Sequence, residues 1–255
     1  METDFLGMPG VDVWLFAGLS LASFLTTFLG MVTGAAGGLL LLMVLATVFP
    51  PVVLVPLHTV VQLGSNIGRI VMMHEYVLWP ILIPFIIGSI IGGIAGAQIF
   101  VALPPRLLQG IIATFALFAL WVPQIGSFGP ERGRFAMVGF LSTFIGVFVS
   151  ATGTLVAPFI NSASPDRRNY VATFSTLMAI THTAKMGAFM LAGVAIGVYA
   201  PLMAAMIASM VLATWLGRRV LDRVPEKLFR GVLKVVLTLL ALRLLWVAAD
   251  LSSLF

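Results

Sequence analysis

Apolar segments long enough to cross a bilayer dominate this chain. Hydrophobic residues make up 60% of its 255 residues, and charged residues only 9%. A transmembrane helix needs about 20 mostly apolar residues, and isolated segments can span lipid only as helices, which pair all of their own backbone groups. The sequence therefore predicts an all-α polytopic membrane protein. The predicted segments cover residues 12–30 with a broken continuation to 49, then 52–73, 77–100, 106–123, 134–160, 168–190, 195–217 and 226–249.

The chain also carries two degenerate copies of one membrane unit. Small residues recur at every fourth position in one segment and again 121 positions later, as Gly88, Gly92 and Gly96 and as Ser209, Ala213 and Gly217. Such faces favour close helix packing. The repetition predicts two tandem homologous halves of about four transmembrane segments each, about eight in total. We place the first repeat at residues 1–123, a connecting loop at 124–133 and the second repeat at 134–255.

Small residues interrupt the first apolar segment of each half. Residues 29–38 hold four glycines, each less favourable in a helix than alanine by about 1 kcal/mol. A helix that restarts after such a break directs free N–H groups and its positive dipole end at whatever fills the gap. Small-residue packing is the alternative for either copy alone, but two copies at matching positions favour a binding site. The predicted site residues in the breaks are Thr33, Gly34, Gly37, Gly38, Ser150, Thr152, Gly153 and Thr154.

Polar residues recur at helical spacing inside two other apolar segments. The first stripe comprises His58, Thr59, Gln62, Asn66 and Arg69, and the second comprises Thr173, Thr176, His182 and Lys185. At about 100° per residue, the first stripe shares one helix face. Ionisable residues inside spans are costly and are functional by default, so we expect both stripes to bind substrate. Snorkelling is the alternative for Arg69 and Lys185, and a structural role is the alternative for either histidine.

The distribution of charge indicates which ligand suits this interior. All nine acidic residues fall in loops, at helix ends or at termini, whereas a cation or proton carrier normally needs a carboxylate within a span. Buried cations and helix N-termini suit an anion instead. Proton coupling would have to use His58 or His182. The chain has no cysteine and no motif of a soluble enzyme, so we expect no catalytic residue, no metal site and no cofactor.

The basic residues predict the orientation in the membrane. The net charge is +5, but the bases lie mainly in short loops, which indicates positive-inside topology and not nucleic-acid binding. The richest loop, at 218–230, is predicted to be cytoplasmic, with both termini outside and no cleaved signal at the acidic N-terminus. Two arrangements remain open for the broken segments. Each crosses once, or each dips in and returns, which would invert the two halves and suit rocking between them.

The pattern resembles the sulfite exporter TauE/SafE family of membrane permeases from about Val13 to Trp246. The resemblance rests on the duplicated unit, the breaks at residues 34–38 and Gly153, the apolar run that ends in Pro158 and the Ala172-Thr173 pair. The first copy departs from it, because residues 39–49 lack the expected proline. The resemblance implies transport of small, often sulfur-containing anions such as sulfite, sulfonates or sulfoacetate across a bacterial inner membrane.

We therefore predict a secondary transporter, an exporter by hypothesis, that works by alternating access on a small anion. Arg69 and Lys185 are predicted to pair with its charge, and Thr33, Thr152, Thr154 and the glycine N–H groups to recognise its oxygens. The expected partners are the anion, membrane lipids and protons as a candidate coupling ion, and the chain is expected to be a monomer or a homodimer. A passive anion channel and a non-transporting membrane assembly partner are the alternatives.

Overall fold

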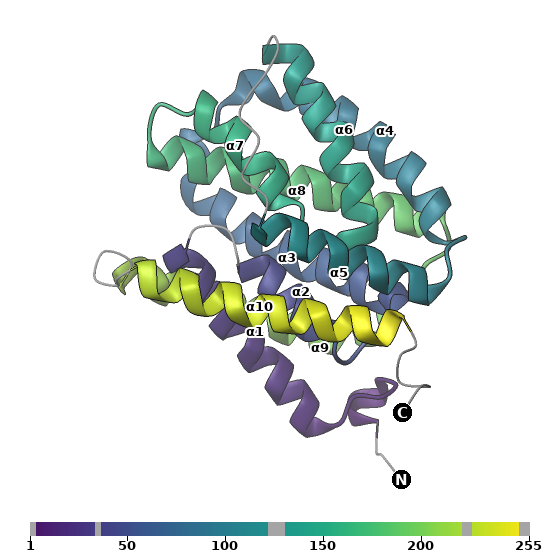
Figure 1. Cartoon of the computed structure of the whole chain (residues 1–255). Helices are drawn as coiled ribbons and strands as arrows, with labels where there is room; N and C mark the ends of the chain where they lie inside the picture. Colours follow the sequence, from purple (N-terminus) through teal and green to yellow (C-terminus); the bar gives the residue numbers. More distant parts are fainter. Residues whose placement is uncertain (1–3, 34–36, 122–130, 221–225, 250–255) are drawn as a thin grey trace.

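A computed structural model describes residues 4–33, 37–121, 131–220 and 226–249 (Figure 1). Within these ranges the chain is helical, without strands, as predicted. Besides four 3-10 helices, it forms α1 (Val13–Thr33), α2 (Gly37–Leu45), α3 (Pro51–Met73), α4 (Leu82–Phe100), α5 (Pro105–Trp121), α6 (Glu131–Val149), α7 (Gly153–Ala163), α8 (Arg167–Leu191), α9 (Ala200–Val220) and α10 (Glu226–Ala248).

Several of these helices have the length and composition of membrane spans. Three stretches are long and apolar enough to cross a bilayer, namely Val13–Gly30 in α1, Trp79–Phe100 leading through α4, and Gly197–Gly217, which runs from a short 3-10 helix into α9. Shorter apolar helices cover Pro105–Trp121 and Gly133–Val149. Helices α3 and α8 carry the two polar stripes and are not among these apolar stretches, and they lie in the middle of the bundle in Figure 1. Polar residues are tolerated there because neighbouring helices shield them from lipid.

The two segments predicted to be broken each consist of two helices. Helix α1 ends at Thr33 and α2 begins at Gly37, while α6 ends at Val149 and α7 begins at Gly153. Helices α1 and α2 touch across the first break, because a Cβ placed on Gly30 would lie 2.9 Å from the Gly37 Cα. The α2 helix therefore folds back along α1 instead of continuing it.

Each broken segment starts and finishes at the same end of the helix bundle. Tyr199 contacts both ends of the first one, since its hydroxyl donates to Pro9 O at 3.3 Å and its ring packs on Phe49 at 5.4 Å between centroids. Phe135 near the start of α6 and Ile160 near the end of α7 share one buried apolar cluster. Of the two arrangements that the sequence left open, the structure has the returning one.

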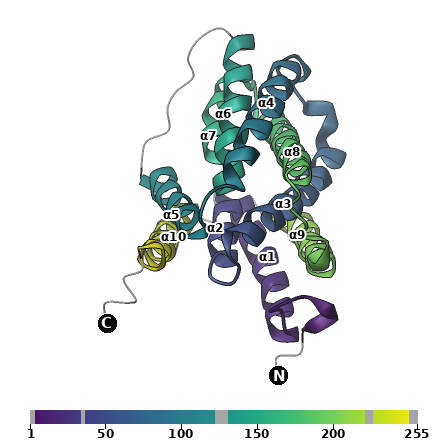
Figure 2. The same ribbon diagram turned by 90° about the vertical axis from the view of Figure 1, so that its right-hand side faces the viewer.

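Helices within residues 13–121 pack on helices within residues 131–248 in pairs. Helix α1 packs on α9 and α6 packs on α4, while α3 packs on α8 and α5 packs on α10. The α4–α6 pair lies at the top of Figures 1 and 2, and the α5–α10 pair runs side by side at one edge of Figure 2. A Cβ on Gly88 or Gly92 would meet the backbone of Ala136 or Phe140, so these glycines serve helix packing, as predicted.

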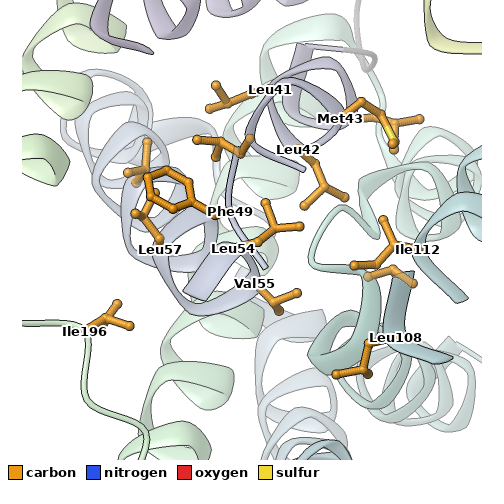
Figure 3. Close-up of a cluster of buried hydrophobic side chains, with 14 of the residues drawn as sticks. Leu41, Leu42, Met43, Phe49, Leu54, Val55, Leu57, Leu108, Ile112 and Ile196 are labelled. Carbon is orange, nitrogen blue, oxygen red and sulfur yellow. The ribbon is translucent and has the colours of Figure 1, made fainter. Parts of the chain in front are cut away.

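A buried apolar cluster holds the short helix α2 in place. Seven residues of α2 are buried. Figure 3 shows Leu42 of α2 pointing toward Leu54 of α3 and Ile112 of α5, and Leu41 and Met43 belong to the same buried cluster. A helix of nine residues is marginal on its own in water, so tertiary packing fixes where it begins. The N-terminus of α2 is thereby held in the middle of the bundle.

Candidate functional site

A cavity of about 80 Å³ lies where the two breaks meet the two polar helices. By volume it can hold several water molecules or one small ion. Its lining comes from α1, α2, α3, the α6–α7 break, α7, α8 and α9. The lining residues are Thr27, Gly30, Gly37, Gly38, Leu39, His58, Gln62, Asn66, Arg69, Ser150, Ala151, Thr152, Gly153, Thr154, Phe174, Met178, His182 and Met210.

Most of the site residues predicted from the sequence face this one cavity. The structure brings together Gly37, Gly38, His58, Gln62, Asn66, Arg69, Ser150, Thr152, Gly153, Thr154 and His182. These residues come from both breaks and from both polar stripes, which are far apart in the chain. Gly34 lies outside the described residues, and only the backbone of Thr33 is described, as the last residue of α1.

Four predicted residues do not line the cavity. Thr59 Oγ1 donates to Val55 O at 2.7 Å, and Thr176 Oγ1 donates to Ala172 O at 2.9 Å, so both hydroxyls are used within their own helices. Thr173 Oγ1 accepts the backbone N–H of Leu78 at 3.0 Å. Lys185 is the fourth, and its contacts are described below. None of these four side chains lines the cavity.

Two helices begin at the cavity. Gly37 is the first residue of α2 and Gly153 the first of α7, and both line the cavity. The first N–H groups of a helix have no partner inside the helix, and the positive end of its dipole favours an anion. At α7 the N-cap residue Thr152 makes no capping hydrogen bond with its side chain. Both helix starts are therefore oriented to interact with a negative group.

Five cavity-lining side chains carry a buried polar atom without a hydrogen-bond partner in the described part of the chain. These atoms are Thr27 Oγ1, Arg69 Nε, Thr152 Oγ1, Thr154 Oγ1 and His182 Nδ1. Buried polar atoms in folded proteins are nearly always paired, and a buried unpaired one costs roughly 1–3 kcal/mol. Their convergence on one small cavity indicates a polar ligand that completes their hydrogen bonding.

The two predicted cations have different surroundings. Arg69 is half-buried on the cavity, and it forms no ion pair with any described residue. Lys185 is fully buried, and its Nζ donates to Ser150 O at 3.1 Å and to Ser150 Oγ and Gly146 O at 3.4 Å each. Lys185 therefore does not snorkel to an interface. None of the described cavity-lining residues is acidic, so Arg69 carries the uncompensated charge of the site.

Ser150 is contacted by side chains of both polar helices, α3 and α8. It is fully buried, and its φ of 58° lies in the left-handed region that residues other than glycine rarely adopt. His58 links it to the first break, because His58 Nδ1 lies 2.8 Å from Ser150 Oγ and His58 Nε2 lies 2.9 Å from Gly38 O. Backbone strain of this kind persists only where the surroundings enforce it.

Sequence reasoning missed part of the lining. Thr27 had a visible signal, because it continues a series of small polar residues in α1 with Ser23 and Thr26. Phe174, Met178 and Met210 had none, since apolar residues in an apolar segment look alike whether they face lipid, core or cavity. Their placement follows from how α8 and α9 pack.

A second and larger cavity lies elsewhere and contains none of the predicted site residues. It measures about 280 Å³ and lies between the end of α2, the start of α3, α5 and α10. Its lining is mostly apolar, with Thr47, Gln109 and Arg243 as the polar members. The smaller central cavity is therefore the candidate site, because it combines both helix starts with the unpaired polar atoms.

Most of the chain matches one known protein family. A model of the sulfite exporter TauE/SafE family matches residues 19–244. This range contains both breaks, both polar helices and every residue that lines the central cavity. Neither a curated protein nor a solved structure matches the chain.

Proposed function

Because the chain belongs to the sulfite exporter TauE/SafE family of multi-pass membrane transporters, we propose that it exports small sulfur-containing anions, such as sulfite, sulfonates or sulfoacetate-like organic acids, by alternating access. The central cavity would hold the anion. Bacterial inner-membrane localisation, with both termini outside, is part of the same proposal.

The observation that carries this proposal is the set of unpaired polar groups on the cavity. Thr152, Thr154 and Thr27 offer hydroxyl hydrogens, and Arg69 offers an N–H and a positive charge. An oxyanion has several acceptor oxygens around one centre, and it can satisfy donors that approach from different helices. Because no described residue on the cavity is acidic, the site lacks the group that a cation would need.

The helix arrangement supports a carrier over a channel. The returning segments start from opposite ends of the bundle, since Tyr199 packs at the start of α9 and the cluster around Phe135 and Ile160 lies with the α3–α4 connection. The α1–α9 and α6–α4 contacts are reciprocal, as expected of inverted halves that rock against each other. In that mechanism the cavity opens to one side at a time.

Transport measurements in proteoliposomes test the proposal. We expect sulfite or sulfonate flux that saturates with concentration, together with counterflow of labelled substrate against unlabelled substrate. Single-channel currents without counterflow would instead show a passive anion channel. Absence of any flux, with a stably copurifying partner protein, would support an assembly role and contradict transport.

The substrate class can be determined separately from transport. A ligand that binds only the folded state increases the free energy of unfolding by mass action, by about 2.7 kcal/mol at a concentration one hundred times its Kd. The melting temperature rises accordingly. We expect purified protein to be stabilised by sulfite, a short sulfonate or sulfoacetate, and not by chloride or by sodium and potassium compared as chloride salts. Stabilisation by cations alone would exclude the proposed site chemistry.

A further inference from the structure

The ammonium group of Lys185 is already saturated by the protein. A lysine ammonium has three N–H donors, and the three acceptors within reach are Ser150 O, Ser150 Oγ and Gly146 O. All three belong to the C-terminal end of α6 and the break that follows it. The negative end of a helix dipole lies at its C-terminus. The C-terminal end of α6 therefore compensates the buried charge of Lys185.

The side chain of Lys185 reaches this position through a gap that glycine provides. A Cβ on Gly146 would lie 3.3 Å from Lys185 Cδ and 3.2 Å from Thr152 Oγ1. The lysine stem therefore passes directly beside Gly146 before its ammonium meets Ser150. Lys185 itself does not line the cavity. Its contacts place it behind the break, against the backbone.

The break that Lys185 contacts determines where α7 begins. Ser150 has a left-handed backbone conformation, and its N–H donates to Gly146 O at 2.8 Å. The chain turns at this residue and continues through Thr152 to Gly153, the first residue of α7, both on the cavity wall. If Ser150 relaxed to an ordinary conformation, the start of α7 would point elsewhere.

Hydrogen bonds connect Ser150 to the first break, and each member donates to the next one toward Gly38. Gly38 O can only accept, so His58 Nε2 carries the proton and the neutral ring leaves Nδ1 as an acceptor for the Ser150 hydroxyl. Ser150 Oγ in turn accepts from Lys185 at 3.4 Å. The distances from Ser150 Oγ to His58 Nδ1 and from His58 Nε2 to Gly38 O are 2.8 and 2.9 Å. Lys185, Ser150, His58 and Gly38 thus form a continuous chain between the two helix starts.

We propose that Lys185 is a positioning residue, which holds Ser150 in its left-handed conformation and thereby places the starts of α7 and, through His58, of α2 around the bound anion. This proposal rests on the proposed function, and it gives Lys185 a role other than the charge pairing expected from the sequence. Arg69 then remains as the cation that meets the ligand. His182, whose Nδ1 is unpaired on the cavity, is the histidine available to the ligand, whereas both nitrogens of His58 are engaged.

Substitution of Ser150 by glycine separates positioning from charge pairing. Glycine adopts positive φ without strain, so it supplies the backbone conformation that Lys185 enforces. We expect Lys185→Met to weaken sulfite binding by about tenfold or more, a change of about 1.4 kcal/mol. The double variant Lys185→Met/Ser150→Gly should bind sulfite within about threefold of Ser150→Gly alone. A double variant that binds sulfite at least tenfold more weakly than Ser150→Gly alone would overturn the proposal, because the lysine would then contribute to binding even when glycine supplies the backbone conformation.

A second substitution at the same position keeps the test valid if Lys185→Met does not fold. Lys185→Gln retains N–H donors but removes the positive charge. Positioning predicts sulfite affinity closer to the wild type than to Lys185→Met, and charge pairing predicts an affinity as low as that of Lys185→Met. The matched control is Lys234→Met, which removes a cation that lies 3.8 Å over the Trp121 ring on the α5–α10 pair, away from the cavity. It should leave sulfite affinity unchanged.

A readout that does not involve the anion distinguishes failure of this proposal from failure of the proposed function. The chain has no cysteine, so Thr154→Cys provides a single thiol at the start of α7. We expect its labelling rate with a small methanethiosulfonate reagent to change when Lys185→Met is added, and to return when Ser150→Gly is added as well. An unchanged rate in the Lys185→Met background would refute positioning even if sulfite binds. Lack of sulfite binding in the wild type, with the labelling pattern as expected, would refute only the proposed function.

Discussion

Gly30 of α1 and Gly37 of α2 lie backbone against backbone, with 2.9 Å between the Gly37 Cα and the position that a Cβ on Gly30 would occupy. A Cβ on Gly37 would in turn collide with Thr26 O. The tight return of the first broken segment therefore depends on two glycines seven positions apart, which the sequence shows only as part of a glycine-rich run.

Substitution of either glycine by alanine should destabilise the folded protein. We expect Gly37→Ala and Gly30→Ala to cost about 1–3 kcal/mol each, because overpacking at a backbone contact forces the helices apart. Thermal unfolding in detergent measures the effect. Gly110→Ala in α5 is the matched control, since a Cβ there meets nothing within 4 Å. It should be neutral or stabilising by up to about 1 kcal/mol, and an equal loss in all three variants would contradict the close contact.

Removal of an unpaired hydroxyl at the cavity should raise stability and lower anion binding together. Thr154 Oγ1 is buried without a partner in the described part of the chain, so Thr154→Val should stabilise the ligand-free protein by about 1 kcal/mol while reducing the stabilisation by sulfite. Melting temperatures with and without sulfite measure both effects.

Thr59→Val is the comparison for that variant. Its hydroxyl is paired with Val55 O at 2.7 Å and lies 3.2 Å from Ser150 Oγ, so the ligand-free protein should lose about 1 kcal/mol. If Thr154→Val proved as destabilising as Thr59→Val, the Thr154 hydroxyl would have a protein partner and would not be reserved for a ligand.

Arg69 should be the cation on which anion transport depends. We expect Arg69→Gln to reduce sulfite flux by roughly 10- to 100-fold, the equivalent of a charge-assisted hydrogen bond of about 1.5–3 kcal/mol. Arg69→Lys should retain more flux, because it keeps the charge and loses only the planar fork of donors. Flux into proteoliposomes at matched protein content measures both. Lys234→Gln, on the α5–α10 pair, should transport normally, and normal flux in Arg69→Gln would remove Arg69 from the site.

The returning arrangement makes a prediction about sidedness. Val48, between α2 and α3, and Glu75, between α3 and α4, are both exposed and lie at opposite ends of α3. In whole cells, a membrane-impermeant maleimide should label Val48→Cys from outside and should reach Glu75→Cys only after permeabilisation. The cysteine-free sequence provides a background without labelling. The opposite pattern would reverse the proposed orientation, and labelling of both positions from one side would contradict the helix order.

The sequence predicted helix positions well where local signals mark the ends. Helix α3 begins at Pro51, one residue before the predicted start, and α8 begins at Arg167 after Asp166, which accepts N–H groups of Arg168 and Asn169. The start of α4 was predicted less accurately, at residue 77, whereas the helix begins at Leu82. There two short 3-10 helices precede Leu82, and Pro80 lies within one of them. Short irregular turns in an apolar context carry little periodic signal.

The site was predictable in outline but not in its inner arrangement. Helical spacing placed Gln62, Asn66 and Arg69 on one face, and the structure puts that face on the cavity. The same reasoning could not distinguish His58 from His182, because both are histidines in a polar stripe. What separates them is that Ser150 and Gly38 occupy both nitrogens of His58, a contact across 92 residues that follows only from the packing of the two halves.

The contacts of Tyr199 with Pro9 and Phe49 impose an order on biogenesis. Tyr199, which contacts both ends of the first hairpin, is synthesised some 150 positions after Phe49. The hairpin therefore lacks these contacts in the bilayer until α9 has been inserted. A chain truncated after α8 should keep this hairpin susceptible to proteolysis near Phe49, whereas the full-length chain should protect it. Completion of the second half would thus be the event that locks the first.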